Sequence, residues 1–282
     1  MNASKPRPSF PARLDSTPAN AKLSKPAQSV PPVQPGLRGL VSVVASARPT
    51  VPAPPTRSHG LGMDSSAVRA SMVKKLAAGG VTDAKVLAAM GTIERHRFVD
   101  SALANQAYED TSLPIGLGQT ISKPGVVSRM AELLRNGNPN KLGRVLEVGT
   151  GCGYQAAVLS LLADEVYSIE RLRGLHDKAR ENLRLLRLPN LHLLFGDGMQ
   201  GFAKGAPYAA IISAAGGEAV PQAWIDQLAM GGRLVAPVVV GPSSGGTSPG
   251  SQALMVLDKT PQGIRRTVLE AVHFVPLKSG LA

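Results

Sequence analysis

The hydrophobic positions after residue 64 follow first a helical and then a strand-like pattern. Between residues 64 and 92, apolar residues recur at spacings of three or four, which predicts two short helices. Gly79-Gly80 ends the first of them, and Thr82 is the expected cap of the second. After a polar, turn-rich stretch over residues 106–119, a third helix is predicted over 124–134. This part of the chain is therefore expected to be mainly helical.

From residue 144 onward, short β-branched runs alternate with helical segments, which indicates an α/β fold with a parallel, doubly wound sheet. Near the end, two apolar runs joined by a polar stretch predict an antiparallel hairpin at a sheet edge. The stretch 241–251, rich in glycine and serine, is expected to be a flexible loop. The predicted strands are 144–148, 165–169, 191–195, 209–213 and 234–240, the helices 155–162, 174–185 and 221–228, and the hairpin strands 254–257 and 268–275.

Residues 1–62 differ in composition from the rest of the chain. They hold 12 of the 23 prolines, and eight lysines and arginines against one acidic residue. Such a segment buries too little apolar surface to offset its ordering entropy, so we expect a disordered extension before one domain over 63–282. Ala45-Ser46-Ala47 resembles the cleavage site of an export signal, and the composition also fits an organellar transit peptide. A plain extension is favoured over both, and Met63 is a possible alternative start.

Charge and composition exclude several classes of protein. Of the formal net charge of +12, seven units lie in residues 1–62, so the charge is weak support for nucleic acid as a specific partner. No stretch approaches the about 18 to 20 apolar residues of a membrane span. The single cysteine, Cys152, allows neither an internal disulfide nor a multi-cysteine zinc site, and the five histidines lack metal-ligand spacing. We expect a cytoplasmic monomer without a metal.

A glycine-rich turn follows the first predicted strand of the sheet. Gly149, Gly151 and Gly153 form a G-x-G-x-G pattern that leads through Tyr154 into a helix, which is where open α/β sheets bind nucleotides. The pattern lacks the third glycine position of the dinucleotide fingerprint and the Lys-Ser/Thr of a phosphate-binding loop. Glu147, two residues before the first glycine, would repel a pyrophosphate. A ligand with a cationic, phosphate-free end fits better.

Acidic residues also follow the next two strands. Glu170 lies 21 residues after Gly149, where a carboxylate can accept hydrogen bonds from a ribose diol. Asp197 and Gly198 follow the third strand and suit the edge of an adenine. Each feature alone has a simpler explanation, as a tight turn, a solvated charge or a turn residue. Their order at successive strand ends favours a site for S-adenosyl-L-methionine, in which Cys152 is a small filler.

Residues 113–124 carry a diagnostic motif. Their sequence, LPIGLGQTISKP, resembles the L-P-I-G-x-G-Q-T-I-S-x-P signature of the protein-L-isoaspartate O-methyltransferases, which methylate abnormal isoaspartyl residues. Generic methyltransferases lack this signature. The resemblance extends from about residue 72 to 282, with further matches in the correct order at 95–99, 144–154, 195–198, 231–238 and 274–277.

The resemblance implies the Rossmann-like fold of S-adenosylmethionine-dependent methyltransferases, with a mostly parallel seven-stranded sheet, a carboxy-terminal antiparallel hairpin and extra amino-terminal helices. Within the domain, residues 63–140 would carry these helices and the active-site segment, and residues 141–282 the cofactor-binding sheet. The implied reaction transfers a methyl group to the free α-carboxylate of L-isoaspartyl residues in damaged proteins and peptides. It gives a methyl ester and S-adenosyl-L-homocysteine, and starts repair to aspartate.

The resemblance also assigns site residues. Ser122 matches the family's active-site serine, and Gln119, Thr120 and Ile121 would lie beside the cofactor. From the residues alone, Ser122 could instead cap the helix that begins at Pro124.

The chain departs from the family pattern at three places. Ala209 stands where an aspartate is usual, residues 94–96 replace a common Pro-Arg-Glu, and the strand end at residues 213–217 is looser than the usual Thr-Ala-Ala. The first two departures do not touch the cofactor motifs, and all three concern substrate preference more than chemistry.

Two other functions remain open on the sequence. A nucleic-acid methyltransferase is disfavoured, because residues 213–216 are not the Asn/Asp-Pro-Pro-aromatic box that holds a flipped base, and no Pro-Cys nucleophile is present. A regulatory protein that binds the cofactor without turnover would keep the same glycine loop, so only a test of methyl transfer separates it from an enzyme.

Overall fold

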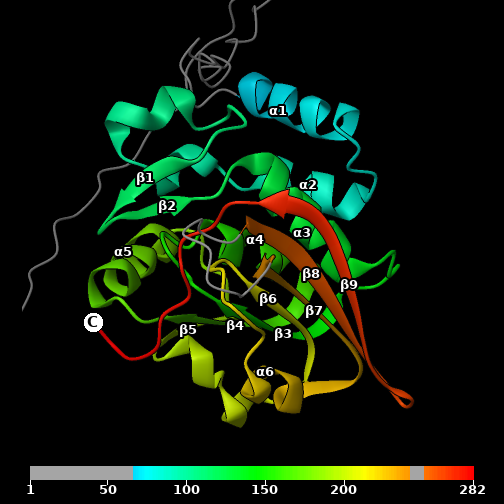
Figure 1. Cartoon of the computed structure of the whole chain (residues 1–282). Coiled ribbons are helices and arrows are strands. Elements are labelled where there is room, and N and C mark those ends of the chain that lie inside the picture. Colours follow the sequence, from blue (N-terminus) through cyan, green and yellow to red (C-terminus); the bar gives the residue numbers. More distant parts are fainter. Residues whose placement is uncertain (1–65, 242–250) are drawn as a thin grey trace, which may run out of the picture. The chain divides into compact units, whose positions relative to one another are not determined.

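The computed structural model of the chain describes residues 66–241 and 251–282, so the expectations for residues 1–62 and Met63, and most of the loop expected at 241–251, lie outside the described residues. The described part is built on a seven-stranded sheet in the order β5-β4-β3-β6-β7-β8-β9 (Figure 1). The strands are β3 (Leu142–Val148), β4 (Ala163–Glu170), β5 (Leu191–Phe195), β6 (Tyr208–Ser213), β7 (Leu228–Val240), β8 (Ser251–Thr260) and β9 (Gly263–Val272).

The sheet confirms the predicted doubly wound α/β architecture. Strands β5, β4, β3, β6 and β7 pair in parallel, whereas β7–β8 and β8–β9 pair antiparallel, so the expected hairpin forms one edge. The chain leaves β3 toward β4 and β5 on one side and returns to add β6 on the other side. The strand order therefore reverses beside β3, and ligands of open α/β sheets bind at such a reversal.

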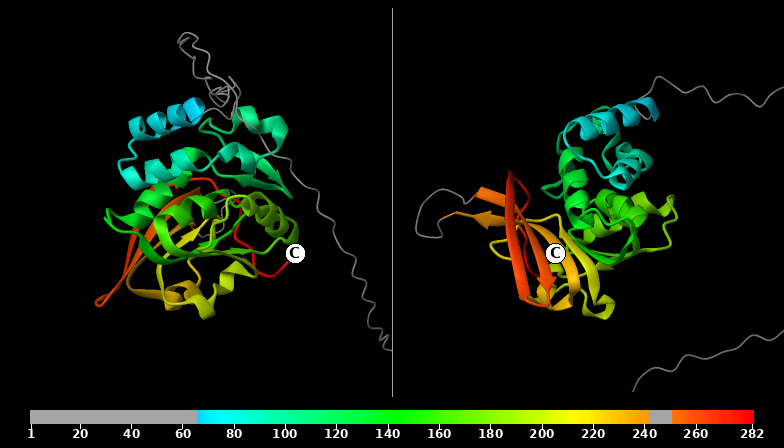
Figure 2. Two further views of the ribbon diagram at one scale, coloured as in Figure 1. Left: turned by 180° about the vertical axis from the view of Figure 1, so that it is seen from behind. Right: turned by 90° about the vertical axis from the view of Figure 1, so that its right-hand side faces the viewer.

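Helices cover the two faces of the sheet unequally. On one face, α3 (Pro124–Arg135) and α4 (Tyr154–Leu162) share a core with β3, β4, β6 and β7, and α5 (Arg173–Arg184) packs beside them. On the other face, α6 (Gln222–Gln227) contributes Trp224 and Ile225 to a second core. Two further helices, α1 (Ser66–Ala78) and α2 (Ala84–Thr92), stack beyond α3 and α4, as Figure 2 shows in cyan. Among the described residues, none of the helices has the length and apolar character that a membrane crossing needs.

The segment before α3 contains structure that the sequence did not predict. The stretch 106–119, expected to be turns, includes β1 (Leu113–Gly116), which pairs antiparallel with β2 (Gln119–Ile121). Before it come two 3-10 helices, η1 (Arg95–Phe98) and η2 (Ser101–Gln106). The two strands are too short for a clear alternation, and the glycines that form their turn read as loop residues. This hairpin carries the diagnostic motif.

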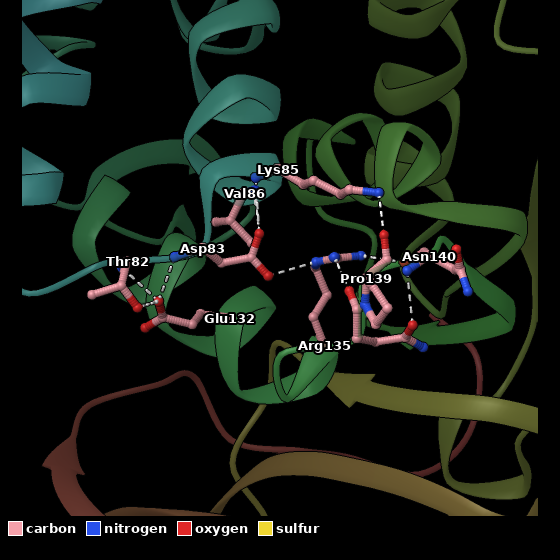
Figure 3. A network of polar contacts seen from close by, with 9 residues as sticks. Thr82, Asp83, Lys85, Val86, Glu132, Arg135, Pro139 and Asn140 are labelled. Atoms are coloured by element: carbon pink, nitrogen blue, oxygen red, sulfur yellow. Dashed lines mark hydrogen bonds and ion pairs between the residues drawn. The ribbon is translucent and has the colours of Figure 1, made fainter.

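The cap of α2 also differs from the prediction. Asp83, not Thr82, is the N-cap: its Oδ1 accepts from the N–H groups of Lys85 and Val86 at 2.8 and 3.1 Å. Thr82 instead donates from its hydroxyl and its backbone N–H to Glu132 of α3 (Figure 3). Both residue types cap helices well, so local sequence could not choose between them.

Asp83 additionally pairs with a buried arginine of α3. Arg135 donates from Nε to Asp83 Oδ2 at 2.7 Å and from Nη1 to the carbonyl of Asn140 at 3.0 Å, and its side chain is 2% exposed (Figure 3). Burial alone would raise the pKa of Asp83, but the hydrogen bonds from Arg135, Val86 and Lys85 outweigh it and lower that pKa below 3.8. The pair fixes the amino-terminal helices on the helix that starts next to Ser122.

The Asp83→Asn variant tests this pair. Asparagine also caps helices, so the change removes mainly the charge-assisted part of the bond, and we expect the free energy of unfolding to fall by about 1 kcal/mol at neutral pH. Because the folded pKa of Asp83 is lowered, its stabilisation is present above the unfolded value and is lost as the pH falls through the folded pKa. Urea unfolding at several pH values should show a difference in the free energy of unfolding between wild type and Asp83→Asn that disappears in acid. The exposed Asp164→Asn variant should unfold like the wild type.

Candidate active site

Two cavities meet at the carboxyl ends of the parallel strands. The first, of about 470 Å³, lies where β3, β4 and β6 end, and the hairpin β1–β2 and residues 275–278 form its other walls. The second, of about 940 Å³, lies between the ends of α1 and α3 and strand β9. Both cavities are lined by Thr120, Ser122, Ala214 and Val275, which therefore mark the place where the two adjoin.

The glycine loop lies at the floor of the first cavity. Its three glycines have φ angles of 90°, 57° and 92°, in the left-handed region that favours glycine. A Cβ on Gly153 would come within 2.8 Å of Leu183 in α5, and one on Gly151 within 3.2 Å of Ile115 in β1. Gly149 and Gly151 line the cavity, as does the buried Tyr154, but Gly153 does not. Gly153 is thus required for packing beneath the loop.

Glu170, at the end of β4, is held by the backbone on both carboxylate oxygens. Its Oε2 accepts from the N–H of Gly151, and its Oε1 accepts from the N–H groups of Arg171 and Leu172, each at 2.9 Å. The side chain lines the first cavity and the residue is 5% exposed. A carboxylate offers about four acceptor positions, so about one remains for a ligand hydroxyl, rather than the two that the sequence suggested.

Glu147 lies behind the glycine loop and does not line either cavity. It is fully buried, and the Ser168 hydroxyl donates to its Oε2 while also meeting the Thr150 hydroxyl at 2.6 Å. Burial raises the pKa of Glu147 to about 8, although Ser168 and Gln155 act in the opposite direction. The structure therefore places a predominantly protonated carboxyl group beneath the loop at neutral pH, not a carboxylate facing the ligand.

Replacing Glu147 with glutamine is expected to make stability less dependent on pH. The folded state keeps the Glu147 proton up to a pH of about 8, whereas the unfolded chain loses it near 4.5. Wild-type stability should thus fall between these values relative to Glu147→Gln, by more than about 1 kcal/mol, and the difference should stay constant at higher pH. Chemical denaturation of both proteins from pH 4 to 9 measures it. A gap that does not change with pH would contradict the buried proton.

Asp197 and Gly198 follow β5, but only Gly198 lines the first cavity. Asp197 accepts from the N–H of Met199 through Oδ1 and from the N–H of Gly280 through Oδ2, at 2.9 and 2.8 Å. It thereby holds the carboxy-terminal segment, and Val275 of this segment accepts from the N–H of Gly216 after β6 at 2.8 Å. Sequence reasoning did not identify this wall, because only pairing in three dimensions brings residues 275–278 to the strand ends.

The hairpin β1–β2 brings the diagnostic motif to both cavities. Its tip, Gly116-Leu117-Gly118, has positive φ throughout, and Lys178 of α5 donates to the carbonyl of Ile115 at 2.8 Å. Gln119, Thr120, Ile121 and Ser122 all line the first cavity. Sequence patterns gave no indication of the contribution of Lys178, since a lysine on an amphipathic helix usually faces solvent.

Ser122 is not a helix cap. The N-cap residue of α3 is Lys123, and no side chain caps that helix. The Ser122 side chain is partly buried, and within residues 66–241 and 251–282 its hydroxyl has no hydrogen-bond partner. The capping interpretation is therefore wrong, and the hydroxyl is available to a ligand at the junction of the cavities.

The first cavity fits the cofactor that the sequence indicated. Its volume lies within the range of small-molecule sites, about 300–1,000 Å³, and two residues of its floor, Gly149 and Gly151, have no Cβ atom. One carboxylate has a free acceptor position, and the loop has no lysine for a phosphate. Among the described residues, no cluster of three or more His, Cys, Asp or Glu side chains could hold a metal ion. This sheet, with such a cavity where its strand order reverses, is the architecture expected of a methyltransferase that uses S-adenosyl-L-methionine.

Comparison with known proteins narrows this class. The chain belongs to the protein-L-isoaspartate(D-aspartate) O-methyltransferase family, whose model matches residues 67–282. It is 54% identical to the protein-L-isoaspartate O-methyltransferase of Methylibium petroleiphilum, over 98% of this chain and 97% of that protein. It is 52% identical to that of Leptothrix cholodnii, over 99% of this chain and 98% of that protein.

Solved structures agree with this assignment. A protein-L-isoaspartate O-methyltransferase matches with a TM-score of 0.66 and 27% identity, over 76% of this chain and 67% of that one. A putative enzyme of the same kind from Plasmodium falciparum, in complex with S-adenosyl-L-homocysteine, has the same fold, with a TM-score of 0.61 and 23% identity, over 74% of this chain and 98% of that one.

Proposed function

We propose that the first cavity binds S-adenosyl-L-methionine and that the second binds an isoaspartyl peptide. The methyl group is then transferred from the cofactor to the peptide where the two cavities adjoin. The observation that carries this proposal is the set of four residues shared by both cavities, among them Ser122 with its unpaired hydroxyl. The chain is then a protein-L-isoaspartate O-methyltransferase, which transfers the methyl group to the free α-carboxylate of L-isoaspartyl residues and so initiates their repair.

The residues that hold the cofactor come from four segments. Gly149 and Gly151 offer backbone without side chains, Glu170 offers an acceptor for a ribose hydroxyl, and Gly198 leaves room at the end of β5. Residues 119–121 close the cavity from the hairpin. We propose that Glu147, Gly153 and Asp197 do not contact the cofactor and instead stabilise the walls of this cavity from behind. When bound, the cofactor supplies an electrophilic methyl group on a sulfonium.

The substrate carboxylate needs no general base. An α-carboxyl group has a pKa of about 3.5 and is ionised at neutral pH. Its oxygen forms a bond to the methyl carbon as the carbon–sulfur bond breaks and the electron pair stays on sulfur, which gives a methyl ester and S-adenosyl-L-homocysteine. Ser122 would donate a hydrogen bond to the carboxylate and hold its oxygen about 3 to 3.5 Å from the methyl carbon. Burial raises the pKa of Cys152 to about 11, so this side chain is a neutral thiol at neutral pH.

A methyl-transfer assay tests the proposal. Labelled S-adenosyl-L-methionine is offered with an L-isoaspartyl peptide, with the same peptide containing normal aspartate, and with duplex and single-stranded nucleic acid. Base-labile label on the isoaspartyl peptide alone is the expected result. Label on nucleic acid, or cofactor binding without transfer to any acceptor, would contradict the proposal.

The domain, the oligomeric state and the location of the protein are further proposals. We propose that residues 63–282 form one catalytic domain, supported by a hydrophobic cluster that joins α1 and α2 to α4 and α5. We also propose a monomer, because one chain lines both cavities, and a cytoplasmic location, with which the free thiol of Cys152 is compatible. Sedimentation of the active protein as a dimer would contradict the monomer.

A further inference from the structure

Arg95, the first residue of η1, is a buried cation with no acidic partner. The residue is 0% exposed, and none of the ion pairs among residues 66–241 and 251–282 includes it. Taking a guanidinium out of water costs several kcal/mol, and an apolar side chain of similar size is often a cheaper filler of such a position. Burial accordingly lowers the pKa of Arg95. The hydrogen bonds that the guanidinium makes must therefore offset this cost.

The contacts of Arg95 join the two parts of the proposed site. Its Nε donates to the carbonyl of Ala107 at 2.7 Å, and its Nη2 reaches the carbonyl of Thr111 at 3.4 Å, just before β1. Its guanidinium lies over the ring of Tyr154, 4.9 Å from the centroid, and Tyr154 follows the glycine loop and lines the first cavity. Only a long side chain with several donors in a plane can make all three contacts.

The segment that Arg95 holds, residues 107–111, also contacts the end of the motif that carries Ser122. Asp110 accepts from the N–H of Gly125, in the first turn of α3, at 2.6 Å, and its carboxylate lies 3.8 Å from Lys123 Nζ. A Cβ on Gly125 would come within 2.9 Å of Asp110. Residues 107–111 are thus fixed by Arg95 on one side and adjoin the Ser122–Gly125 turn on the other.

We infer that Arg95 is a positioning residue for methyl transfer: through residues 107–111 and Tyr154 it sets the place of Ser122 relative to the glycine loop. This inference rests on the proposed function, because Ser122 and the loop face the two reactants. A displacement of about 1 Å between groups that hold reactants can cost about 100-fold in rate. Loss of Arg95 should therefore lower kcat more than it weakens the binding of either reactant.

The test compares Arg95→Lys and Arg95→Met with Arg135→Lys, a matched change at a buried arginine that is paired with Asp83. Each variant is assayed with the isoaspartyl peptide below its Tm, and S-adenosyl-L-homocysteine binding is measured by calorimetry. We expect kcat to fall about 10-fold in Arg95→Lys and about 100-fold in Arg95→Met, with KM for the peptide and Kd for S-adenosyl-L-homocysteine within about threefold. Arg135→Lys should lower Tm and leave kcat within about twofold.

Three results would overturn the inference: Arg95 variants that keep the wild-type kcat, a loss of S-adenosyl-L-homocysteine binding in parallel with kcat, or an equal loss of kcat in Arg135→Lys. If Arg95→Met does not fold, Arg95→Lys is decisive on its own. A wild-type chain that methylates no isoaspartyl peptide would instead overturn the proposed function, and the inference with it.

Discussion

The Ser122→Ala variant should lose about 100-fold in kcat, with KM for S-adenosyl-L-methionine within about threefold of the wild type. The Ser122 hydroxyl lines both cavities and has no partner among the described residues, so its removal leaves no other group unsatisfied. What is lost is the hydrogen bond that directs a carboxylate oxygen toward the methyl carbon. Initial rates with the isoaspartyl peptide, at several concentrations of each reactant, measure both parameters.

Ser101→Ala is the control for this change. Ser101 is exposed and lines neither cavity, so its variant should match the wild type. A Ser122→Ala enzyme with at least half of the wild-type kcat would remove Ser122 from the mechanism. A fall in kcat that comes with an equal loss of cofactor binding would assign it to the first cavity alone.

The Glu170→Ala variant should bind S-adenosyl-L-methionine about 100-fold more weakly. The change removes an acceptor for a ribose hydroxyl and also leaves the N–H groups of Gly151, Arg171 and Leu172 without their partner. Each unsatisfied buried donor costs about 1–3 kcal/mol, so the glycine loop should lose its fixed conformation before a ligand arrives. Calorimetric titration with S-adenosyl-L-homocysteine measures the affinity directly.

Glu170→Gln and Glu165→Ala complete this series. Glutamine can keep the two bonds to Oε1 but presents a donor to the N–H of Gly151, so an intermediate loss of about 10-fold is expected. Glu165 lies on the same strand, and its exposed pair with Arg144 contributes little. If Glu165→Ala weakened binding as much as Glu170→Ala, the effect would belong to the strand and not to the carboxylate at its end.

The alternating part of the fold was predictable because its patterns are local. Strand β5 has the predicted bounds, 191–195, and the parallel order follows from the helices between strands. Glu147 was harder to place, because β3 is buried on both faces. The pattern of apolar residues therefore does not show which face of the sheet each side chain of this strand occupies. Its side chain alternates with those of Leu146 and Val148, which belong to the core on the α6 side. Glu147 therefore faces the α4 side, beneath the glycine loop.

The parts of the site that the sequence left unassigned depend on contacts between distant segments. The motif in residues 113–124 identified Ser122, but not the hairpin that presents it, since β1 and β2 are only four and three residues long. Asp197 was correctly placed at a strand end, yet the N–H of Gly280 occupies one of its oxygens. The spacing of residues in a sequence does not reveal that a distant backbone N–H will occupy a carboxylate oxygen that a ligand could otherwise use.

The wall formed by residues 275–278 has a consequence for how the protein folds. These residues and the β1–β2 hairpin, which lies far earlier in the chain, both line the first cavity. Contacts between such distant segments form late, because closing a long loop costs entropy before any contact repays it. During synthesis, a nascent chain that has reached only β7 has no complete pocket. We therefore expect the cofactor to stabilise the finished fold by mass action rather than the intermediates that precede it.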